Sequence, residues 1–301
     1  MQLGGKVAVI TGGASGIGKG TALAMARLGT EIVIADINDR RLEETRAEIA
    51  ALGGRVMAVH CDVSKDADVQ HLAKVALLEM GRVDIVMNNA GVVLRGALEQ
   101  ISMADWEWSF GINVFGVIRG INAFLPHMIA RGSGHIINTS SIAGLVALTG
   151  EGAPYSASKF AVVGLSEALA LYARPKGIGV SILCPGAVDT NLDETERVIG
   201  ITPERADIEA EESGVFHSVL MTPDQIGEIV VDAVRENRFF ILPDRPQQSV
   251  ILKRSQDLNA FLEARLPASP LPQRVKGGRR PMVHDGQRLG CLPETPYQRS
   301  S

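Results

Sequence analysis

The sequence has little cysteine, and its cysteines follow no recognised pattern. Cys61, Cys184 and Cys291 are far apart and odd in number. Such spacing makes neither a disulfide framework nor a metal-binding motif. We therefore expect buried or free thiols in a reducing cytoplasm, and no metal site.

An excess of basic charge and a long apolar run are also missing. The formal net charge is −4, so no basic surface is predicted for binding nucleic acid. No stretch reaches the roughly 18 uninterrupted apolar residues of a membrane span. Met1 leads almost directly into an apolar strand, so we expect no signal peptide. Nucleic acid and membranes are therefore not expected partners.

The chain does contain enough apolar material for one sizeable domain. Its 301 residues are 46% hydrophobic and 21% charged, an ordinary globular balance. Apolar runs alternate with stretches of helical periodicity. The runs are 6–10, 31–35, 55–60, 83–87, 135–139, 180–184 and 239–242, and helices are expected near 16–28, 42–52, 69–77, 103–130, 155–173 and 223–236. This alternation predicts an α/β fold, a doubly wound parallel sheet of the Rossmann type with helices on both faces.

We predict a single catalytic domain over residues 1–266 and a tail over 267–301. The tail has six prolines, and six Lys or Arg against two Asp or Glu, which is typical of a mobile segment. The preceding stretch 246–266 fits one last helix packed on the body. The long connection 191–221 has acidic and apolar sides and predicts a mobile substrate lid, with a packed pair of short helices as the alternative.

Ligands of such a sheet bind beyond the carboxyl ends of the strands. The loop after the first strand reads Thr-Gly-Gly-Ala-Ser-Gly-Ile-Gly over residues 11–18. Its glycines let the backbone approach a pyrophosphate, and the start of the following helix attracts the anion. Taken alone, the pattern also fits a tight strand–helix turn.

Asp36 ends the second strand, 18 residues after Gly18. A carboxylate there accepts hydrogen bonds from the adenosine ribose and repels the extra phosphate of NADP, which predicts NAD. The alternative is a surface aspartate that caps the next helix. Arg40 and Arg41 temper the preference for NAD, although both fit the exposed face of that helix.

Two later loops add candidate cofactor contacts. After the third strand, Asp62 is suited to the adenine amino group and Val63 to the adenine ring. After the fourth strand, residues 88–91 read Asn-Asn-Ala-Gly. We interpret Asn88 as a structural amide that ties backbone segments together, and the other three residues as a border of the cofactor.

Tyr155 and Lys159 are four residues apart on a predicted helix and so share one face. A neighbouring ammonium favours the phenolate and lowers a tyrosine pKa from about 10, which makes tyrosine usable as an acid or base at neutral pH. The pair alone also fits a solvated surface contact.

Polar side chains near this pair offer further catalytic candidates. Ser140 and Ser141 end the fifth strand at the same sheet edge, where a hydroxyl can hold a substrate oxygen or simply form a turn. Asn113 lies in an apolar helix, and its amide needs a partner there. It is either a satisfied core amide or the holder of a water beside Lys159.

Together these motifs resemble those of the short-chain dehydrogenases/reductases, in the family's order over roughly residues 4–243. The resemblance includes Pro185-Gly186-x-Val188-x-Thr190, and it selects Ser141, which precedes Ile-Ala-Gly and stands 14 residues before Tyr155. It implies a catalytic tetrad of Asn113, Ser141, Tyr155 and Lys159. The implied cofactor contacts are Gly12, Ser15, Gly16, Ile17, Gly18, Asp36, Asp62, Val63, Asn89, Ala90, Gly91, Tyr155, Lys159, Pro185, Gly186, Val188 and Thr190. Val188 and Thr190 are expected on the carboxamide side of the nicotinamide.

The resemblance implies an NAD-dependent oxidoreductase that interconverts a secondary alcohol and its ketone. The candidate pocket residues are mostly apolar, which favours a small hydrophobic substrate. They are Val93, Leu94, Ala143, Leu145, Leu148, Thr149, Pro154 and the segment 191–221. A non-catalytic dinucleotide sensor and an epimerase or dehydratase on the same fold are the alternatives. Apolar residues on more than one face of the stretches 103–130 and 155–173 predict a homotetramer or homodimer.

Overall fold

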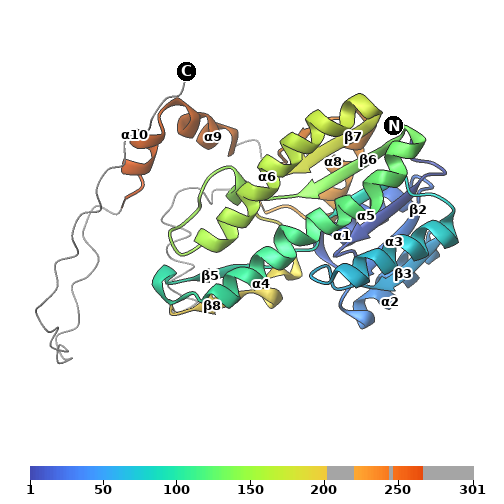
Figure 1. The fold of residues 1–301 in the computed structure, drawn as a ribbon, viewed down its shortest axis with the longest axis horizontal. Helices are drawn as coiled ribbons and strands as arrows, with labels where there is room; N and C mark the ends of the chain where they lie inside the picture. Colours follow the sequence, from blue (N-terminus) through green and yellow to red (C-terminus); the bar gives the residue numbers. More distant parts are fainter. Residues whose placement is uncertain (202–219, 244–246, 267–301) are drawn as a thin grey trace, which may run out of the picture.

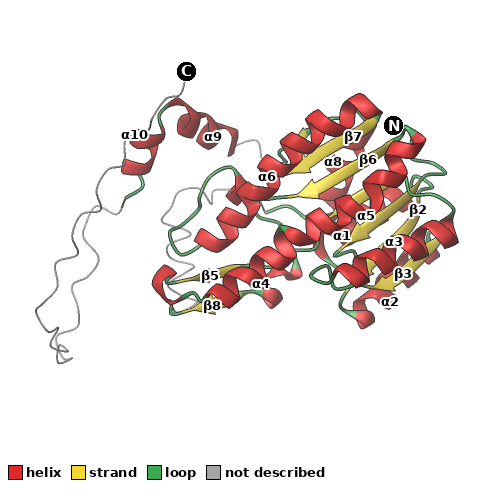
Figure 2. Cartoon of the chain, viewed as in Figure 1, coloured by secondary structure: helices red, strands yellow, loops and turns green. Residues whose placement is uncertain are grey.

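The computed structural model of the protein describes residues 1–201, 220–243 and 247–266. Strands and helices alternate along the chain in the predicted order (Figures 1 and 2). The first elements are β1 (Val7–Thr11), α1 (Gly16–Ala26), β2 (Glu31–Asp36), α2 (Asp39–Ala51), β3 (Val56–His60), α3 (Asp66–Met80), β4 (Ile85–Asn88), β5 (Leu94–Gly96), η1 (Leu98–Gln100) and α4 (Met103–Asn113). They are followed by α5 (Phe115–Arg131), β6 (Gly134–Thr139), η2 (Ile142–Gly144), α6 (Ala153–Ala173), η3 (Arg174–Lys176), β7 (Ile178–Leu183), η4 (Asn191–Thr195), β8 (Arg197–Ile199), α8 (Pro223–Arg235), β9 (Phe240–Ile241), α9 (Gln247–Gln256) and α10 (Leu258–Glu263).

Seven strands of the described residues form one parallel sheet in the order β3-β2-β1-β4-β6-β7-β9. This confirms the predicted doubly wound parallel sheet. From β1 the chain adds β2 and β3 toward one edge of the sheet, and from β4 it adds β6, β7 and β9 toward the other edge. The loops that follow the adjacent strands β1 and β4 therefore lead away in opposite directions. A crevice at such a reversal is where α/β sheets bind their ligands, and both loops carry candidate cofactor residues.

Alternate residues of each strand supply two separate apolar cores. In β1, Val7 and Val9 pack with α3, α5 and α6, whereas Ala8 and Ile10 pack with α1, α2 and α8. Successive side chains of a strand point to opposite faces. A strand covered on both faces must therefore be apolar throughout, which is why the strands read as continuous apolar runs.

The helix expected over 103–130 is two helices in the structure. α4 ends at Asn113, Val114 has a φ of −109°, and α5 begins at Phe115. The Asn113 side chain bonds the backbone of Val92 rather than its own helix. Apolar periodicity continues through the break, so the pattern did not reveal it.

The stretch Met103–Arg131, which contains both helices, is long and apolar enough to cross a membrane by length and composition alone. Within the fold, α5 directs Val117, Ile121, Phe124 and Met128 into the core beside β4 and β6. Packing against the sheet therefore accounts for the apolar residues on one face of α5.

Part of the predicted lid is packed on the body. β8 pairs in parallel with β5 from Leu94↔Arg197 to Gly96↔Ile199, and the Arg197 guanidinium lies 3.7 Å from the centre of the Trp108 ring. The described start of the connection therefore packs against β5 and Trp108. Residues 202–219 of the predicted lid lie outside the described residues.

Beyond β9, the described residues 247–266 form two helices, α9 and α10, where one was expected. They are separated at Asp257, whose carboxylate caps α10 by accepting a hydrogen bond from the Ala260 amide. Arg265, just after α10, donates to the carbonyl oxygens of Ala147 and Leu148 at 2.7 and 2.5 Å. The extension thus contacts the loop between η2 and α6. The predicted tail 267–301 lies outside the described residues.

Candidate active site

The loop between β1 and α1 forms a tight cradle. Gly12 and Gly16 have φ values of +63° and +50°, which residues other than glycine rarely adopt. A Cβ at Gly18 would lie 2.2 Å from the Gly12 carbonyl oxygen, and one at Gly12 would lie 2.9 Å from the Ala90 Cα. The glycines therefore allow the loop after β4 to pack directly on this turn.

The start of α1 is suited to an anionic group. Ser15 occupies the N-cap position, and its side chain makes no capping hydrogen bond to the helix. The first N–H groups of a helix have no partner within the helix, and an anion at that end is favoured by the helix dipole. The predicted contacts Ser15, Gly16 and Ile17 therefore fit a dinucleotide pyrophosphate.

Asn89 holds three loops of the site together. Its amide nitrogen donates to the carbonyl oxygens of Thr11 and Gly12 at 3.1 and 3.3 Å, and its amide oxygen accepts from the Thr139 hydroxyl at 3.2 Å. Asn88 points elsewhere and donates to the Asn138 side chain at 2.9 Å. The structure thus gives Asn88 the expected structural contact, and it gives Asn89 a bracing role that the sequence did not suggest.

Asp36 lies at the end of β2, beside the glycine cradle. Its carboxylate accepts hydrogen bonds from the amides of Ala14 at 3.3 Å and Asn38 at 3.1 Å. The two arginines differ in their surroundings. Arg40 pairs with Glu44 at 2.6 Å, as expected of an outer face, whereas Arg41 makes two hydrogen bonds with the distant Glu194.

Asp62 and Val63 directly follow β3, which pairs with β2 in the sheet. Burial raises the pKa of Asp62, but hydrogen bonds from Ser64 and Lys65 outweigh it, so the net shift is downward and favours the carboxylate. Val63 is buried against α5, where a Cβ at Gly116 would lie 2.9 Å from its Cγ2. The ionised acid and apolar neighbour have the characters predicted for an adenine pocket.

Tyr155, Lys159 and Ser141 meet at the carboxyl edge of the sheet. Lys159 is only 4% exposed; its Nζ donates to the Thr139 carbonyl oxygen at 3.3 Å and lies 5.6 Å from the centre of the Tyr155 ring. The half-buried Tyr155 is hydrogen-bonded through its side chain to Ser141. The alternative of a solvated surface pair is therefore wrong.

The expected shift of the Tyr155 pKa is not found. Burial raises the pKa of Tyr155 above its ordinary value of 10.0, and the hydrogen bond from Ser141 only partly opposes this. Burial also lowers the pKa of Lys159 to about 8. Removing a group from water disfavours its charged form. In this structure burial, rather than the Lys159 ammonium, dominates the Tyr155 pKa.

The two serines after β6 have different partners. The Ser140 hydroxyl donates to the Lys159 carbonyl oxygen at 2.8 Å and so fastens β6 to α6. The Ser141 oxygen accepts a hydrogen bond from the Ala143 amide at 3.1 Å and lies against Tyr155. The geometry therefore agrees with the choice of Ser141 as the serine nearer to the reacting groups.

Asn113 is brought to the same site but its side chain is already used. The amide oxygen accepts from Val92 N at 2.9 Å, and the amide nitrogen donates to Val92 O and Ser158 Oγ, both at 3.0 Å. A Cβ at Gly91 would lie 3.2 Å from Asn113 Oδ1 and 3.3 Å from Lys159 Nζ. Of the two interpretations, the structure has the satisfied core amide, placed beside Lys159.

Comparison with known proteins agrees with this geometry. Residues 6–198 match the family model described as short chain dehydrogenase. An uncharacterized oxidoreductase of Listeria monocytogenes is 38% identical over 78% of this chain and 92% of its own length. A protein of Lactiplantibacillus plantarum named "CLA biosynthesis dehydrogenase/reductase" is 35% identical over 79% of this chain and 87% of its own length.

A solved structure of a short-chain dehydrogenase/reductase from Burkholderia phymatum, in complex with NAD, is 35% identical to this chain. It superposes with a TM-score of 0.79 over 90% of this chain and 99% of the other. The chain belongs to the short-chain dehydrogenase/reductase family. It is therefore an oxidoreductase of that family, as the resemblance of its motifs implied.

The segment after β7 connects the loop after β6 with the glycine cradle. The Pro185 carbonyl accepts from the Ile142 amide at 2.9 Å, which anchors the start of the segment below Ser141. Val188 pairs with Met221, and a Cβ at Gly16 would lie 3.0 Å from Thr190 Cγ2. Thr190 thus reaches the glycine cradle, and Gly186 and Val188 lie on the path between it and Ser141.

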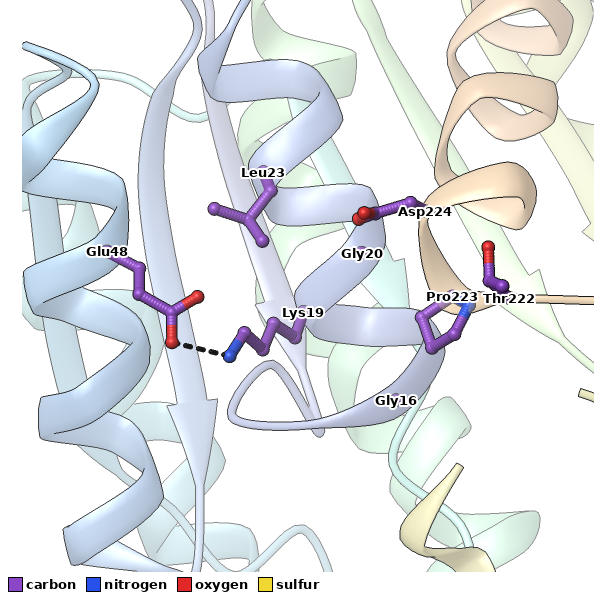
Figure 3. A pocket seen from close by; sticks show the side chains of 8 residues that line it. All are labelled: Gly16, Lys19, Gly20, Leu23, Glu48, Thr222, Pro223 and Asp224. Atoms are coloured by element: carbon purple, nitrogen blue, oxygen red, sulfur yellow. Dashed lines mark hydrogen bonds and ion pairs between the residues drawn. The ribbon is translucent and has the colours of Figure 1, made fainter. Parts of the chain in front are cut away.

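Part of the predicted wall of the substrate pocket differs from expectation. Leu94 and Ala143, expected in the substrate pocket wall, are fully buried instead. A pocket of about 350 Å³ lies between α1, Glu48 of α2 and the start of α8. Figure 3 shows its lining residues, among which Lys19 is paired with Glu48 at 2.7 Å. Its lining contains none of the four tetrad candidates: it consists of Gly16, Lys19, Gly20, Leu23, Glu48, Thr222, Pro223 and Asp224.

Sequence reasoning missed several residues that shape the site. Thr11 and Thr139 brace the cradle through Asn89, and Cys184 lies beside Lys159 with a pKa that burial raises to about 12. Cys184 is a buried free thiol, as is Cys61. Single threonines and cysteines in strand ends carry no periodic signal, so only their neighbours in space identify them.

Proposed function

We propose that this protein is an NAD-dependent alcohol dehydrogenase/ketone reductase that acts on a hydrophobic secondary alcohol and its ketone. The observation that carries the proposal is the buried Lys159 next to the Tyr155–Ser141 pair, at the same sheet edge as the glycine cradle. A dinucleotide-binding sensor has no need for an acid–base pair in that position.

Tyr155 is the acid and base of the proposed reaction. Its hydroxyl gives a proton to the carbonyl oxygen during reduction and takes the alcohol proton during oxidation. Ser141 donates a hydrogen bond to the same substrate oxygen as charge develops on it. When bound, the nicotinamide supplies or accepts the hydride.

Lys159 and Asn113 support Tyr155 in different ways. The Lys159 ammonium is held over the Tyr155 ring and is directed toward the ribose hydroxyls in the proposed complex. Asn113 is a positioning residue, because it fixes Val92, and with it Gly91, against the lysine. Since its two N–H donors and its oxygen already bond Val92 and Ser158, we assign it this role rather than that of holding a water.

The proposed cofactor is NAD. The residues proposed to hold it are Gly12, Ser15, Gly16, Ile17, Gly18, Asp36, Asp62, Val63, Asn89, Ala90, Gly91, Tyr155, Lys159, Pro185, Gly186, Val188 and Thr190. The Asp36 carboxylate favours NAD over NADP because it repels a 2′-phosphate. The NAD complex of the Burkholderia phymatum relative supports this choice.

The remaining features of the proposal concern the whole protein. We propose one catalytic domain over residues 1–266, a substrate lid within 191–221, a cytoplasmic location consistent with the buried free thiols, and a homodimer or homotetramer. An epimerase or dehydratase on this fold would regenerate its cofactor within each turnover, whereas the proposed enzyme accumulates NADH.

The test is a panel of aryl, alicyclic, steroid-like and lipid secondary alcohols, with NADH absorbance as the readout. We expect NADH to accumulate with at least one of them. The Tyr155→Phe variant keeps the ring and should lose nearly all turnover while it binds NADH as wild type does. Residual kcat above a few per cent would contradict the role of Tyr155, and turnover without net NADH would indicate the epimerase alternative.

A further inference from the structure

A salt bridge joins the adenosine end of the proposed cofactor site to the segment after Thr190. Arg41 Nη2 lies 2.7 and 2.8 Å from the two carboxylate oxygens of Glu194, across a separation of 153 residues. Asn191 donates to the same carboxylate at 2.8 Å. The Glu194 side chain therefore has a defined position over the start of α2.

Arg41 lies close to Asp36, the residue proposed to distinguish NAD from NADP. Arg41 belongs to the first turn of α2, and its amide donates to the side chain of Asn38, two residues after Asp36. The Glu194 hydrogen bond is the main cause that raises the Arg41 pKa, and Asp36 adds to it through charge. The guanidinium is therefore within electrostatic range of Asp36, the proposed ligand of the ribose hydroxyls.

Arg40 provides an internal comparison. Its side chain is 69% exposed and pairs with Glu44 one turn along α2, as a solvated helix surface requires. The Arg41 side chain is only 23% exposed. Of the two arginines, only Arg41 is turned toward the segment that covers this end of the site.

We propose that Glu194 is a specificity-determining residue, because it occupies the Nη2 donor of Arg41, a cationic group that would otherwise pair with the 2′-phosphate of NADP. This inference deepens the proposed preference for NAD and rests on it. A guanidinium nitrogen that is paired with a carboxylate is not available to a phosphate, so Glu194 competes with the 2′-phosphate for Arg41. Selectivity for NAD then depends on two carboxylates. Asp36 repels the 2′-phosphate, and Glu194 pairs with Arg41, whose positive charge would otherwise offset that repulsion.

The test compares Glu194→Gln with Asp193→Asn. Both changes remove one negative charge from an acidic residue of η4, but Asp193 is an exposed neighbour without a hydrogen bond to Arg41. Fluorescence titration gives the Kd of NADPH and of NADH for each full-length variant. For Glu194→Gln we expect NADPH to bind about tenfold more tightly, the effect of one hydrogen bond to a charged group, with the Kd of NADH little changed.

Two further outcomes decide the matter. Adding Arg41→Ala to Glu194→Gln should abolish the gain in NADPH affinity. The proposal is overturned if Glu194→Gln leaves the NADPH Kd unchanged, if Asp193→Asn produces the same gain, or if both cofactors weaken equally. A wild-type protein that prefers NADPH would instead contradict the proposed function, and that measurement is made before any substitution.

Discussion

At the scale of single residues, burial determines which form of the acid–base pair is present. Because burial raises the pKa of Tyr155 above 10.0, its hydroxyl is protonated at neutral pH and ready to act as an acid. Lys159, with a pKa of about 8, is mostly an ammonium at pH 7. The resting site is therefore prepared for reduction of a ketone, and oxidation requires loss of the Tyr155 proton.

The rate of oxidation should consequently increase with pH. While the pH is below the pKa of Tyr155, each rise of one pH unit makes the base form of Tyr155 about tenfold more abundant. We therefore expect kcat/KM for alcohol oxidation with NAD to rise between pH 7 and pH 9. Over the same interval kcat/KM for ketone reduction should change less, because the acid form stays dominant. A flat oxidation profile would show that another group, or a strongly lowered Tyr155 pKa in the complex, controls the reaction.

A second buried titratable residue affects stability rather than chemistry. His135 is 2% exposed in β6, and its Nε2 is 2.8 Å from Ser181 Oγ. Burial, with smaller effects of the amino terminus and Arg174, lowers its pKa from 6.5 to about 4. The unfolded chain therefore binds a proton at a higher pH than the folded protein does.

This difference predicts a loss of stability in weak acid. The contribution of neutral His135 is fully present above pH 6.5 and is lost as the pH falls toward 4, by about 3 kcal/mol if the full shift applies. Urea unfolding at pH 7 and pH 5 measures it. A His135→Gln variant should be less stable at pH 7 but lose less free energy of unfolding on acidification. An equal loss in both proteins would assign the pH dependence to other groups.

At the scale of elements, the C-terminal helices hold the loop that precedes Tyr155. Arg265 donates to the carbonyl oxygens of Ala147 and Leu148, and burial lowers the pKa of its guanidinium. Arg254, on α9, lies over the Phe160 ring at 5.3 Å, one residue beyond Lys159. The extension therefore contacts both ends of the segment that carries the acid–base pair.

Removing the Arg265 side chain should loosen this loop. For Arg265→Ala we expect hydrogen exchange over residues 145–152 to become at least about fivefold faster, about 1 kcal/mol, because two hydrogen bonds from a charged donor are lost. Arg254→Ala is the matched control, since it removes a cation of the same extension that lies over a ring instead. Unchanged exchange in Arg265→Ala would mean that the loop is held by its own contacts.

At the scale of the whole molecule, the residues that the structure describes leave an apolar surface on α5 and α6 exposed. Leu171 is 81% exposed and Tyr172 is 56% exposed. A depression of about 550 Å³ lies beside them, lined by Ile121, Asn122, Leu125, Pro126, Ile129, Ala130 and Tyr172. Contiguous apolar surface of this kind is typical of subunit interfaces.

The proposed homo-oligomer should depend on this surface. Light scattering at micromolar concentration should give a multiple of 32.1 kDa. Leu171→Glu should reduce the mass, because burying an unpaired carboxylate in the contact is costly. Leu78→Glu changes a leucine on α3 that is 70% exposed and should leave the mass unaltered. A wild-type monomer would contradict the proposal.

Local patterns in the sequence determined the framework of this protein. Strand order along the chain, the glycine turn and the shared face of Tyr155 and Lys159 all follow from spacing over a few residues. They were predictable because burial on both faces demands apolar strands, a close-packed turn demands glycine, and residues four apart on a helix are neighbours.

Only the tertiary structure decided which side chains meet across large sequence distances. It determined that Ser141 rather than Ser140 faces Tyr155 and that the Asn113 side chain is hydrogen-bonded to the backbone of Val92. It also determined that burial has a larger effect than the lysine charge on the pKa of Tyr155. It also paired Arg41 with Glu194, and Arg265 with a loop 117 residues away. Such contacts have no periodicity, and a pKa depends on the solvent removed from around a group, which no spacing along the chain records.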